Sequence, residues 1–398
     1  MSTHSILAPS DSARWLRCVG SLYMSKGLPN LDAEYNASGT CTHWLAEWAL
    51  TNNVEKLDSW LGKEMTFGTN PPFKFVVDTD RLDRVRTYVA AINREPGTLL
   101  VEQRLDTTPV VGVPDQEGHA DTVKLYPEGG VKDGALLRGV LSVHDLKDGH
   151  LIVYARDNFQ GMIYLCAAMV QYDMTGDYSA FRFCIHQPKL KHYDEWTYTR
   201  QELTAFMEAI RPVAQLAYDL YHGAREFDAA SHLTAGERQC QWCPVRGRCP
   251  ARAQLIIDQF RPIIERHEIT NATLGMILKI APQVRAALTD YEAEALRRAL
   301  TGLHIEGQKL VEGRRGPRKW RDAKAAESAL ALVLTDEKMY EPREIISPAQ
   351  AEKLLRQGYK PLASLVTQSE GNYALAPADD PRAEVKLSQF TPVPDPLV

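Results

Sequence analysis

The segment LRGVLSVHDLK, residues 137–147, combines a β-like run, Leu137–Leu146, with an acidic and a basic side chain at its end. Four such runs can be recognised, at 99–105, 118–125, 137–146 and 181–185. A helical pattern over 158–174 separates the last two, and another over 79–94 precedes the first. The order helix, three strands, helix, strand predicts an α/β fold with a mixed sheet flanked by helices.

Helical periodicity continues on both sides of this region. The expected helices cover residues 11–26, 38–51, 200–222, 251–268, 272–301, 323–334 and 347–357, and a strand-like run covers Lys309–Glu312. At 398 residues the chain is long enough for a full catalytic domain and a smaller unit. We expect a first domain over 1–255, a helical region over 256–302 and a C-terminal α+β region over 303–398.

The composition is that of a folded globular protein, with 44% hydrophobic and 24% charged residues. The N-terminus lacks the basic start and apolar run of a signal peptide, and no apolar stretch approaches the ~20 residues that span a bilayer. We therefore expect a cytoplasmic location and no membrane partner. In such a compartment thiols stay reduced, so closely spaced cysteines among the seven point to a metal centre. The net charge of −5 decides little about partners.

Two aspartates lie where strands of the sheet should end. Asp121 belongs to GHAD (118–121) and Asp145 to HDLK (144–147). Two carboxylates brought together can hold Mg²⁺ or Mn²⁺ through oxygen. Lys147 projects to the same face as Asp145, because strand side chains alternate with a period of two. An ammonium beside a metal can orient or help to deprotonate a water, while the metal polarises a phosphoryl oxygen.

Each of these signals is weak when taken singly, and a D-x-K sequence usually marks a solvated pair. His43 and Glu47 share one face of a helix with two tryptophans, where a histidine is more often a core residue than a ligand. Gln160 and Tyr164 also share a helix face, which suits contact with a nucleic-acid backbone or ordinary partial burial. Glu102, on the first strand, could point into the same site.

Cys240, Cys243 and Cys249 form C-x2-C-x5-C, the sharpest local pattern in the chain. Three thiolates at this spacing can surround one metal centre, but tetrahedral zinc or a cubane cluster requires four ligands. The candidates for the fourth are Cys18, Cys41, Cys166, Cys184 and, for a zinc site, His232. Cys166 and Cys184 have apolar neighbours and are equally well explained as small buried residues.

The stretch KLVEGRRGPRKWRDAK, residues 309–324, has seven basic and two acidic residues, a net charge of +5 around Trp320. Such a run predicts a phosphate-contacting loop with Trp320 available for stacking. A solvated surface loop is an almost equally good interpretation.

Taken in order, four motifs resemble those of the RecB-type branch of the PD-(D/E)XK nucleases. GTCTHWLAE (39–47) resembles G-T-x-x-H-x-x-x-E, GHAD resembles G-x-x-D, DLK (145–147) resembles D/E-x-K and QGMIY (160–164) resembles Q-x-x-x-Y. The resemblance implies a restriction-endonuclease-like core that cleaves DNA with Mg²⁺ or Mn²⁺. It implies that the metal ligands are His43, Asp121, Asp145 and the Leu146 carbonyl, and that Lys147 is the catalytic lysine. Gln160 and Tyr164 would contact the substrate or brace the site. Asp145 stands where many relatives have glutamate.

The chain is further similar to the CRISPR-associated RecB-like exonucleases and the AddB nuclease domain. In these, one cysteine before the histidine motif and three after the Q-x-x-x-Y helix hold a 4Fe–4S cluster. By position the resemblance implies Cys18 as the first ligand and the trio at 240–249 as the others, although Cys41, inside the histidine motif, is a rival. Over its whole length the chain resembles a family of phage and prophage proteins that share S-x3-R-W-L-x-C-x-G-S, a late C-x-W-C segment and a tail like KLVEGRRGPRKW.

These resemblances imply an exonuclease that acts on DNA ends or single strands in phage replication or recombination. Its partners would be DNA and phage single-strand-binding or recombination proteins. Two alternatives stay open: a catalytically inactive DNA-binding or scaffold protein with the same fold, and zinc in place of the iron–sulfur cluster. The sequence decides neither the polarity of digestion nor the oligomeric state.

Overall fold

The computed structural model divides the 398-residue chain into two compact units, residues 1–281 and 282–398. The structure describes residues 5–28, 33–132, 135–264, 270–313, 316–341, 344–354, 364–368, 373–377 and 381–385. Each unit has hydrophobic clusters of its own.

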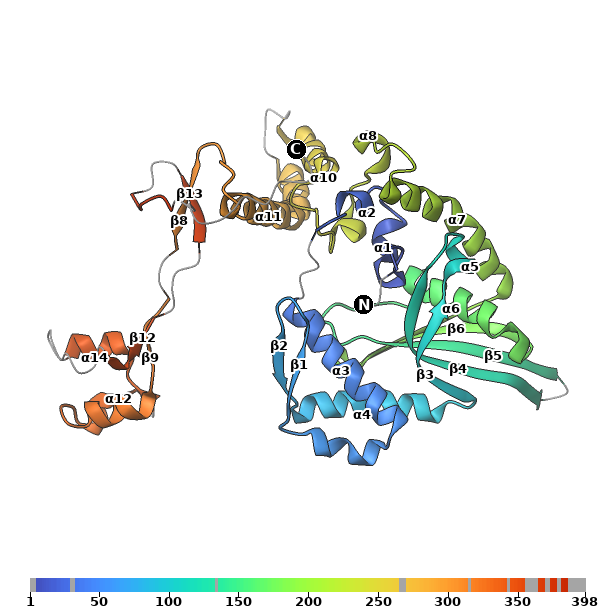
Figure 1. Cartoon of the computed structure of the whole chain (residues 1–398), viewed down its shortest axis with the longest axis horizontal. Helices are drawn as coiled ribbons and strands as arrows, with labels where there is room; N and C mark the ends of the chain where they lie inside the picture. Colours follow the sequence, from blue (N-terminus) through green and yellow to red (C-terminus); the bar gives the residue numbers. More distant parts are fainter. Residues whose placement is uncertain are drawn as a thin grey trace. The chain divides into compact units, whose positions relative to one another are not determined.

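A five-stranded mixed sheet forms the centre of the first unit (Figure 1). Its strands are, in order across the sheet, β3 (Thr98–Asp106), β4 (Glu117–Lys132), β5 (Ala135–Leu146), β6 (Tyr178–Gln187) and β7 (His192–Tyr198). Neighbouring strands are antiparallel except β5 and β6, which are parallel. The connection between these two contains α6 (Phe159–Gln171), since parallel neighbours require a crossover. The predicted mixed sheet flanked by helices is confirmed.

Side-chain alternation gives the two faces of the sheet different characters. On β5, Leu141 and Val143 point to one face, whereas Ser142 and His144 point to the other. The face of Leu141 and Val143 packs against α6 and α7 (Arg200–His222) in the largest hydrophobic cluster of the molecule.

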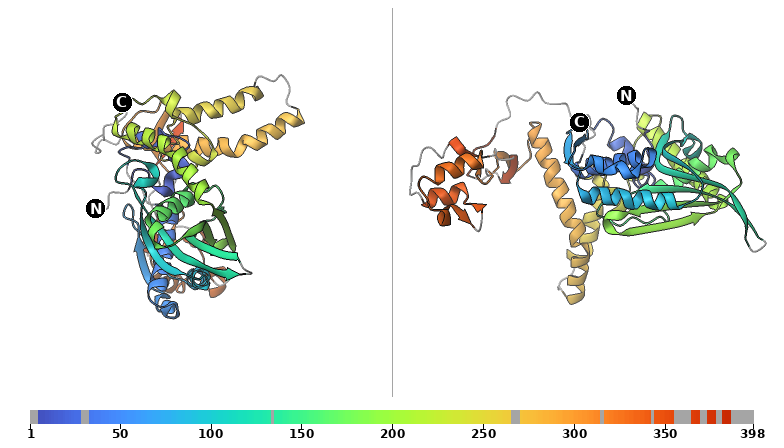
Figure 2. Two further views of the ribbon diagram at one scale, coloured as in Figure 1. Left: turned by 90° about the vertical axis from the view of Figure 1, so that its right-hand side faces the viewer. Right: turned by 90° about the horizontal axis from the view of Figure 1, so that it is seen from below.

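The opposite face of the sheet meets α4 (Thr79–Arg94), which lies beside α3 (Glu34–Thr51) (Figure 2). The Tyr88 hydroxyl of α4 reaches Thr122 Oγ1 on β4 at 2.5 Å. Apolar side chains of α3 and α4 form a second cluster together with Leu146, at the end of β5. This layer therefore lies against the strand ends that carry the predicted catalytic residues.

Helices α4 and α7 have the predicted boundaries, because their ends carry strong capping residues. The Asp78 side chain accepts a hydrogen bond from Arg81 N at the start of α4. Helix α7 begins with a capping box of Thr199 and Glu202 and ends at Gly223, whose φ of 76° favours glycine. Within the described ranges, no helix combines the length and the apolar character needed to cross a lipid bilayer.

The single helix predicted over 11–26 is wrong. The segment instead contains two short helices, α1 (Ser12–Trp15) and α2 (Ser21–Met24). Between them, the Gly20 N–H donates to the His232 carbonyl at 2.9 Å, and not to a carbonyl of the preceding helical turn as it would in one continuous helix. A long-range contact of this kind leaves no trace in local periodicity.

Three strands of the first unit were not predicted. β1 (Glu64–Phe67) and β2 (Phe73–Val76) form a hairpin, and β7 is an edge strand of the main sheet. β7 follows a short turn at Pro188–Leu190 and exposes most of its polar sequence, HYDEWTY, so it lacks the apolar alternation of the inner strands. The predicted strand 181–185 is longer at both ends, as β6.

The second unit contains short strand pairs and helices. β8 (Gln308–Glu312) pairs with β13 (Tyr373–Pro377), and β9 (Lys319–Trp320) pairs with β12 (Val366–Thr367). The helices predicted in and before this unit appear as α10 (Pro250–Ile264), α11 (Asn271–Leu300), α12 (Ala323–Leu330) and α14 (Pro348–Leu354), while 265–268 and 355–357 lie outside the described residues. The predicted strand 309–312 is thus confirmed.

Trp320, the expected stacking residue of the basic stretch, belongs to a small core of the second unit. Its indole N–H donates to the Ile346 carbonyl at 3.1 Å, and its ring packs against the cluster that contains Leu330 and Met339. The interpretation of Trp320 as an available stacking platform is therefore not supported. Arg314 and Arg315, of the same stretch, lie outside the described residues.

Candidate functional site

Asp121 and Asp145 lie on neighbouring strands at one end of the sheet. In the β4–β5 register Thr122 is the partner of His144, and the next position along places Asp121 opposite Asp145 on the same face. Asp121 Oδ2 accepts a hydrogen bond of 2.6 Å from Leu146 N, which holds its carboxylate against β5. Asp145 is only 4% exposed.

Lys147 and Gln160 close around the Asp145 carboxylate. Lys147 N donates to His186 O at 2.8 Å, so the strand pairing continues past Leu146 and directs the lysine to the face of Asp145. Lys147 Nζ lies 2.9 Å from Asp145 Oδ2 and 3.1 Å from Gln160 Oε1. Gln160 Nε2 donates to Asp145 Oδ1 at 3.3 Å. The three side chains form a closed triangle.

His43 reaches the site from α3, with Nδ1 3.0 Å from Asp121 Oδ1. Thr42, the residue before His43, ties α3 to the end of β5, because its Oγ1 donates to Asp148 Oδ2 at 2.8 Å. Asp148 is also paired with Arg84 Nε at 2.9 Å. Asp148 was not predicted as part of the site. Its position directly after Lys147 already indicated that it lies at the same end of β5.

Glu102 joins the site through an unusual backbone conformation. It has a φ of 46°, in the left-handed region that side chains other than glycine rarely adopt, and it interrupts the pairing of β3 with β4. Its carboxylate lies with the ligand atoms of His43 and Asp121 in a group whose members are all within 4.8 Å. Burial raises the pKa of Glu102 to about 7, with further contributions from Asp121 and Glu47. Strain of this kind is often retained where function requires it.

Burial and mutual charge set the pKa values of the other groups. Burial raises the pKa of Asp145, and Asp121 adds to this effect although Lys147 opposes it. Burial also acts to raise the pKa of Asp121, but His43 and the Leu146 N–H outweigh it and the pKa is lowered. Burial lowers the pKa of His43, yet Asp121 and Asp145 together raise it to about 9. A positive charge on His43 thus offsets the carboxylates in the metal-free protein.

The donor set fits a hard divalent cation. Oδ2 of Asp145 is buried, and its partner is the Lys147 ammonium, 2.9 Å away in a geometry too poor for a hydrogen bond. A carboxylate oxygen held only by an ion pair keeps lone pairs that can bind a cation. Carboxylate oxygens with one imidazole suit Mg²⁺ or Mn²⁺. The residues that would hold such an ion are His43, Asp121 and Asp145, with Glu102 adjacent.

Tyr164 lies beside the triangle and explains the glycine of GHAD. The ring is 5% exposed, and burial raises the pKa of its hydroxyl well above the ordinary range. A Cβ at Gly118 would lie 2.7 Å from Tyr164 Cε1 and 2.9 Å from Pro9 Cγ. Strand β4 can therefore approach α6 this closely only because Gly118 has no side chain.

We expect Gly118→Ala to displace Tyr164, to lower the stability by about 1–3 kcal/mol and to reduce any activity of the site, because overpacking of a buried contact forces neighbours to move. The thermal midpoint and the activity would be measured together. Gly39→Ala is the matched control, since a Cβ there meets nothing within 4 Å and alanine favours the helix. Equal losses in both variants would contradict this account.

The cysteines occupy a second site, formed by segments far apart in sequence. Cys18, Cys243 and Cys249 belong to one buried cluster. Cys240 lies near this cluster. Burial has the largest effect in raising the pKa of the Cys18 thiol, and the nearby Cys249 and Cys240 raise it further. Backbone N–H groups point at the sulfurs: Thr234 N lies 3.4 Å from Cys18 Sγ, and Gly236 N lies 3.4 Å from Cys240 Sγ. Such donors stabilise thiolates bound to metal.

Two of the rival fourth ligands lie elsewhere. Cys41 is fully buried in the cluster of α3 and α4. Cys166 lies in the main core, where its thiol donates to Leu203 O at 3.6 Å. His232 is nearer to the cysteines in sequence, but its Nδ1 accepts the N–H of Asp228 at 3.0 Å. The fold thus groups Cys18 with the trio.

Cys184 is buried, as expected of a small core residue, but its neighbours are polar and not apolar. It points to the face of the sheet that carries His144, and its thiol donates to Glu195 Oε2 at 3.9 Å. The alternation in FRFCIHQ, which places Arg182, Cys184 and His186 on one face, was the missed signal.

Comparisons with known proteins show a family for this chain but carry no argument about its chemistry. The chain is similar to a crystal structure of SSO0001, with 10% identity, a TM-score of 0.26, and coverage of 62% of this chain and 86% of that one. It is also similar to a crystal structure described as "Putative exonuclease" from Eubacterium rectale, with 10% identity, a TM-score of 0.30, and coverage of 58% and 89%. At these scores the likeness carries no argument about the site. A family model described as "Protein of unknown function (DUF2800)" matches residues 4–383, and the chain therefore belongs to the DUF2800 family.

Proposed function

We propose that this chain is a metal-dependent deoxyribonuclease of the RecB-like PD-(D/E)XK type. The observation that carries the proposal is the convergence of Asp121, Asp145 and Lys147 at adjacent strand ends, with His43 reaching them from α3. A protein that only binds DNA has no need of buried carboxylates arranged in this way around a lysine. We place its activity at DNA ends or single strands, in phage replication or recombination, on the resemblance of its motifs.

The residues of the site have separable roles. A bound Mg²⁺ or Mn²⁺ would polarise a phosphoryl oxygen and favour ionisation of a water. His43, Asp121 and Asp145 would hold the ion, with the Leu146 carbonyl as a further oxygen donor. Lys147 would orient the attacking water and offset negative charge on the phosphate, since its ammonium already lies beside Asp145. Gln160 braces Lys147 and Asp145 through the hydrogen bonds described above.

For the cysteine site we propose a 4Fe–4S cluster held by Cys18, Cys240, Cys243 and Cys249. The support is the shared burial of Cys18, Cys243 and Cys249, with Cys240 beside them, and the backbone N–H groups directed at the sulfurs of Cys18 and Cys240. The cluster would be structural, because it would tie the N-terminal segment to the chain that follows α7. Anaerobic purification, an absorbance scan and analysis of iron and sulfide test this; zinc without iron or sulfide in this site would overturn it.

The test of activity is a gel assay with end-labelled single- and double-stranded DNA, with and without Mn²⁺. We expect Mn²⁺-dependent release of short labelled products, and none after addition of a chelator. Asp145→Asn should bind DNA but not cleave it. Binding without cleavage by the unaltered protein would favour the scaffold alternative and contradict the proposal.

The affinity for Mn²⁺ should depend on pH through His43. A ligand must lose its proton to bind metal, and the pKa of His43 is raised to about 9, so the proton competes with Mn²⁺ below that pH. Between pH 7, where the Glu102 carboxyl titrates, and pH 9 we expect the affinity to rise by about tenfold per pH unit. Anaerobic calorimetric titrations at several pH values measure this. In His43→Gln the slope should largely disappear, and an unchanged slope would remove His43 from the ligand set.

A further inference from the structure

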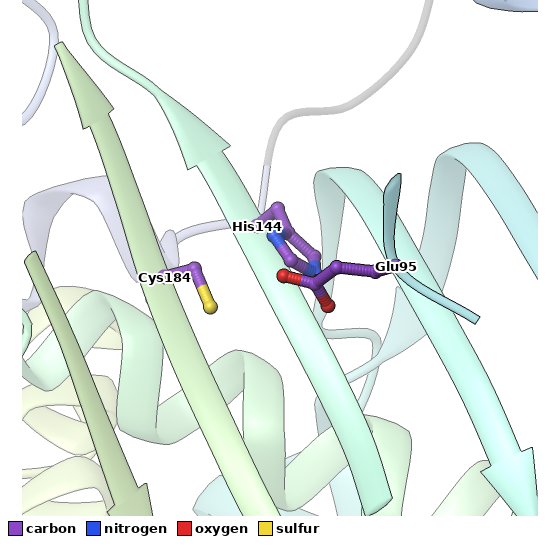
Figure 3. Close-up of side chains that lie close together, drawn as sticks. All are labelled: Glu95, His144 and Cys184. Carbon is purple, nitrogen blue, oxygen red and sulfur yellow. The ribbon is translucent and has the colours of Figure 1, made fainter. Parts of the chain in front are cut away.

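The sheet face opposite the candidate active site carries a second group of potential metal ligands. Asp145 and His144 are consecutive, so their side chains leave β5 on opposite faces. His144 is the register partner of Cys184 on the parallel neighbour β6. Glu95, the residue that follows α4, reaches the same place from the helical layer (Figure 3).

We propose that Glu95, His144 and Cys184 form a zinc site. One carboxylate oxygen, one imidazole nitrogen and the thiol sulfur of these residues all lie within 4.8 Å of one another. Glu95 Oε2 lies 3.4 Å from His144 Nε2. In tetrahedral zinc, bond lengths near 2.0–2.3 Å place ligand atoms about 3.3–3.8 Å apart, so the ligands need move by only about 1 Å to bind. Zinc is the metal that this mixture of donors suits best.

The surroundings of His144 orient it for this role. Its Nδ1 lies 3.1 Å from His186 Nε2, and zinc-bound histidines commonly use their second nitrogen in a hydrogen bond of this kind. In the tautomer that carries its proton on Nδ1, His144 donates to His186, and Nε2 is free to bind zinc beside Glu95. In that tautomer Ser142 Oγ, 3.0 Å from Nε2, donates to it in the metal-free protein. Zinc would replace that hydrogen bond.

The charges around the group can accommodate the metal. In the metal-free protein Arg182 pairs with Glu95 and lies 3.4 Å from Glu195 Oε2, while Lys124 donates to the Glu95 carbonyl. Two carboxylates thus face two cations, and the Cys184 thiol is neutral. Zinc binding would convert the thiol to a thiolate and release its proton, so the group would gain one net positive charge. Tyr193, whose hydroxyl donates to Glu195, completes the polar ring.

The site has a protected interior and an open side. His144 and Cys184 are fully buried, whereas the Glu95 side chain is 20% exposed. A cavity of about 410 Å³ lies beside them and is lined by Glu95, Ser142, Arg182 and Glu195 among others. Of the three proposed ligands only Glu95 lines this cavity, so a fourth ligand such as water would approach the zinc from the side of Glu95. The proposal does not depend on the nuclease activity.

The test is the zinc content of the anaerobically purified full chain after loading with ZnCl2 and desalting, with iron measured in the same sample. We expect one more equivalent of zinc in the unaltered protein than in Cys184→Ser, with equal iron. Cys166→Ser is the matched control, because this buried thiol lies in the apolar core and should leave the zinc content unchanged. Equal zinc in the unaltered protein and Cys184→Ser would overturn the proposal.

A second variant, Glu95→Gln, tests the zinc site independently if Cys184→Ser does not fold. Glu95→Gln alters a side chain that borders the cavity, and it should weaken zinc binding at least tenfold in a competition titration with a chromogenic chelator. Co²⁺ provides a spectroscopic check, since a tetrahedral thiolate complex has visible bands that Cys184→Ser should lose and Cys166→Ser should keep. Unchanged zinc affinity in Glu95→Gln would remove this carboxylate, and with it the three-ligand site.

Discussion

Lys147→Ala should lower DNA cleavage by about a thousandfold, the loss seen when a single buried group that stabilises developing charge is removed. The ammonium lies 2.9 Å from Asp145 Oδ2 and 3.1 Å from Gln160 Oε1, so its removal takes away the cation that is in direct contact with Asp145. Initial rates on end-labelled DNA with saturating Mn²⁺ measure the loss. DNA binding and the absorbance of the cluster should stay the same.

Lys74→Ala is the control for this substitution. Lys74 lies on β2, is paired with Glu64 at 2.7 Å and is largely exposed, so its loss removes the same charge from the same unit without touching the site. Its cleavage rate should equal that of the unaltered protein. Retained cleavage in both Lys147→Ala and Asp145→Asn would show that the chemistry occurs elsewhere.

The sequence predicted those parts of the fold that depend on local pattern. The helices at 79–94 and 200–222 were placed correctly because their apolar stripes end at strong caps. The inner strands of the sheet were recognised because their buried faces impose alternation. β7 was missed because it is an edge strand whose residues are mostly polar and exposed, and such a strand is defined by its neighbour and not by its own pattern.

The candidate site was predictable to the extent that strand ends locate it. Alternation places Lys147 on the face of Asp145, while the motif resemblance and the expected strand ends brought Asp121 into the same set. Glu102 could not be placed from the pattern, because its own backbone has a φ of 46°, in the left-handed region, which interrupts the regular alternation of β3. Asp148 and the ligand group of Glu95 depend on helix packing against the sheet, which involves residues far apart in sequence. Contacts of that kind follow from tertiary structure only.

Cys18→Ser should remove the proposed iron–sulfur cluster and lower the stability of the first unit substantially. A cluster that joins Cys18 to Cys240 closes a loop of about 220 residues, and closure of so long a loop limits the freedom of the unfolded chain. By analogy with a covalent cross-link, its loss costs about 4 kcal/mol, or a fall of about 10 °C in the thermal midpoint. Iron content and thermal unfolding, both under anaerobic conditions, measure the two effects.

Cys41→Ser separates the cluster from general damage to the fold. Cys41 precedes the trio in the chain as Cys18 does and is also buried, but it belongs to the cluster of α3 and α4, apart from the cluster that contains Cys18. If Cys18 is the fourth ligand, Cys41→Ser should retain all of its iron and lose at most the small stability of one buried thiol. Loss of iron in Cys41→Ser with retention in Cys18→Ser would reverse the assignment. Loss in neither variant would mean that a ligand other than these two thiols completes the site, and the long loop would then contribute nothing to stability.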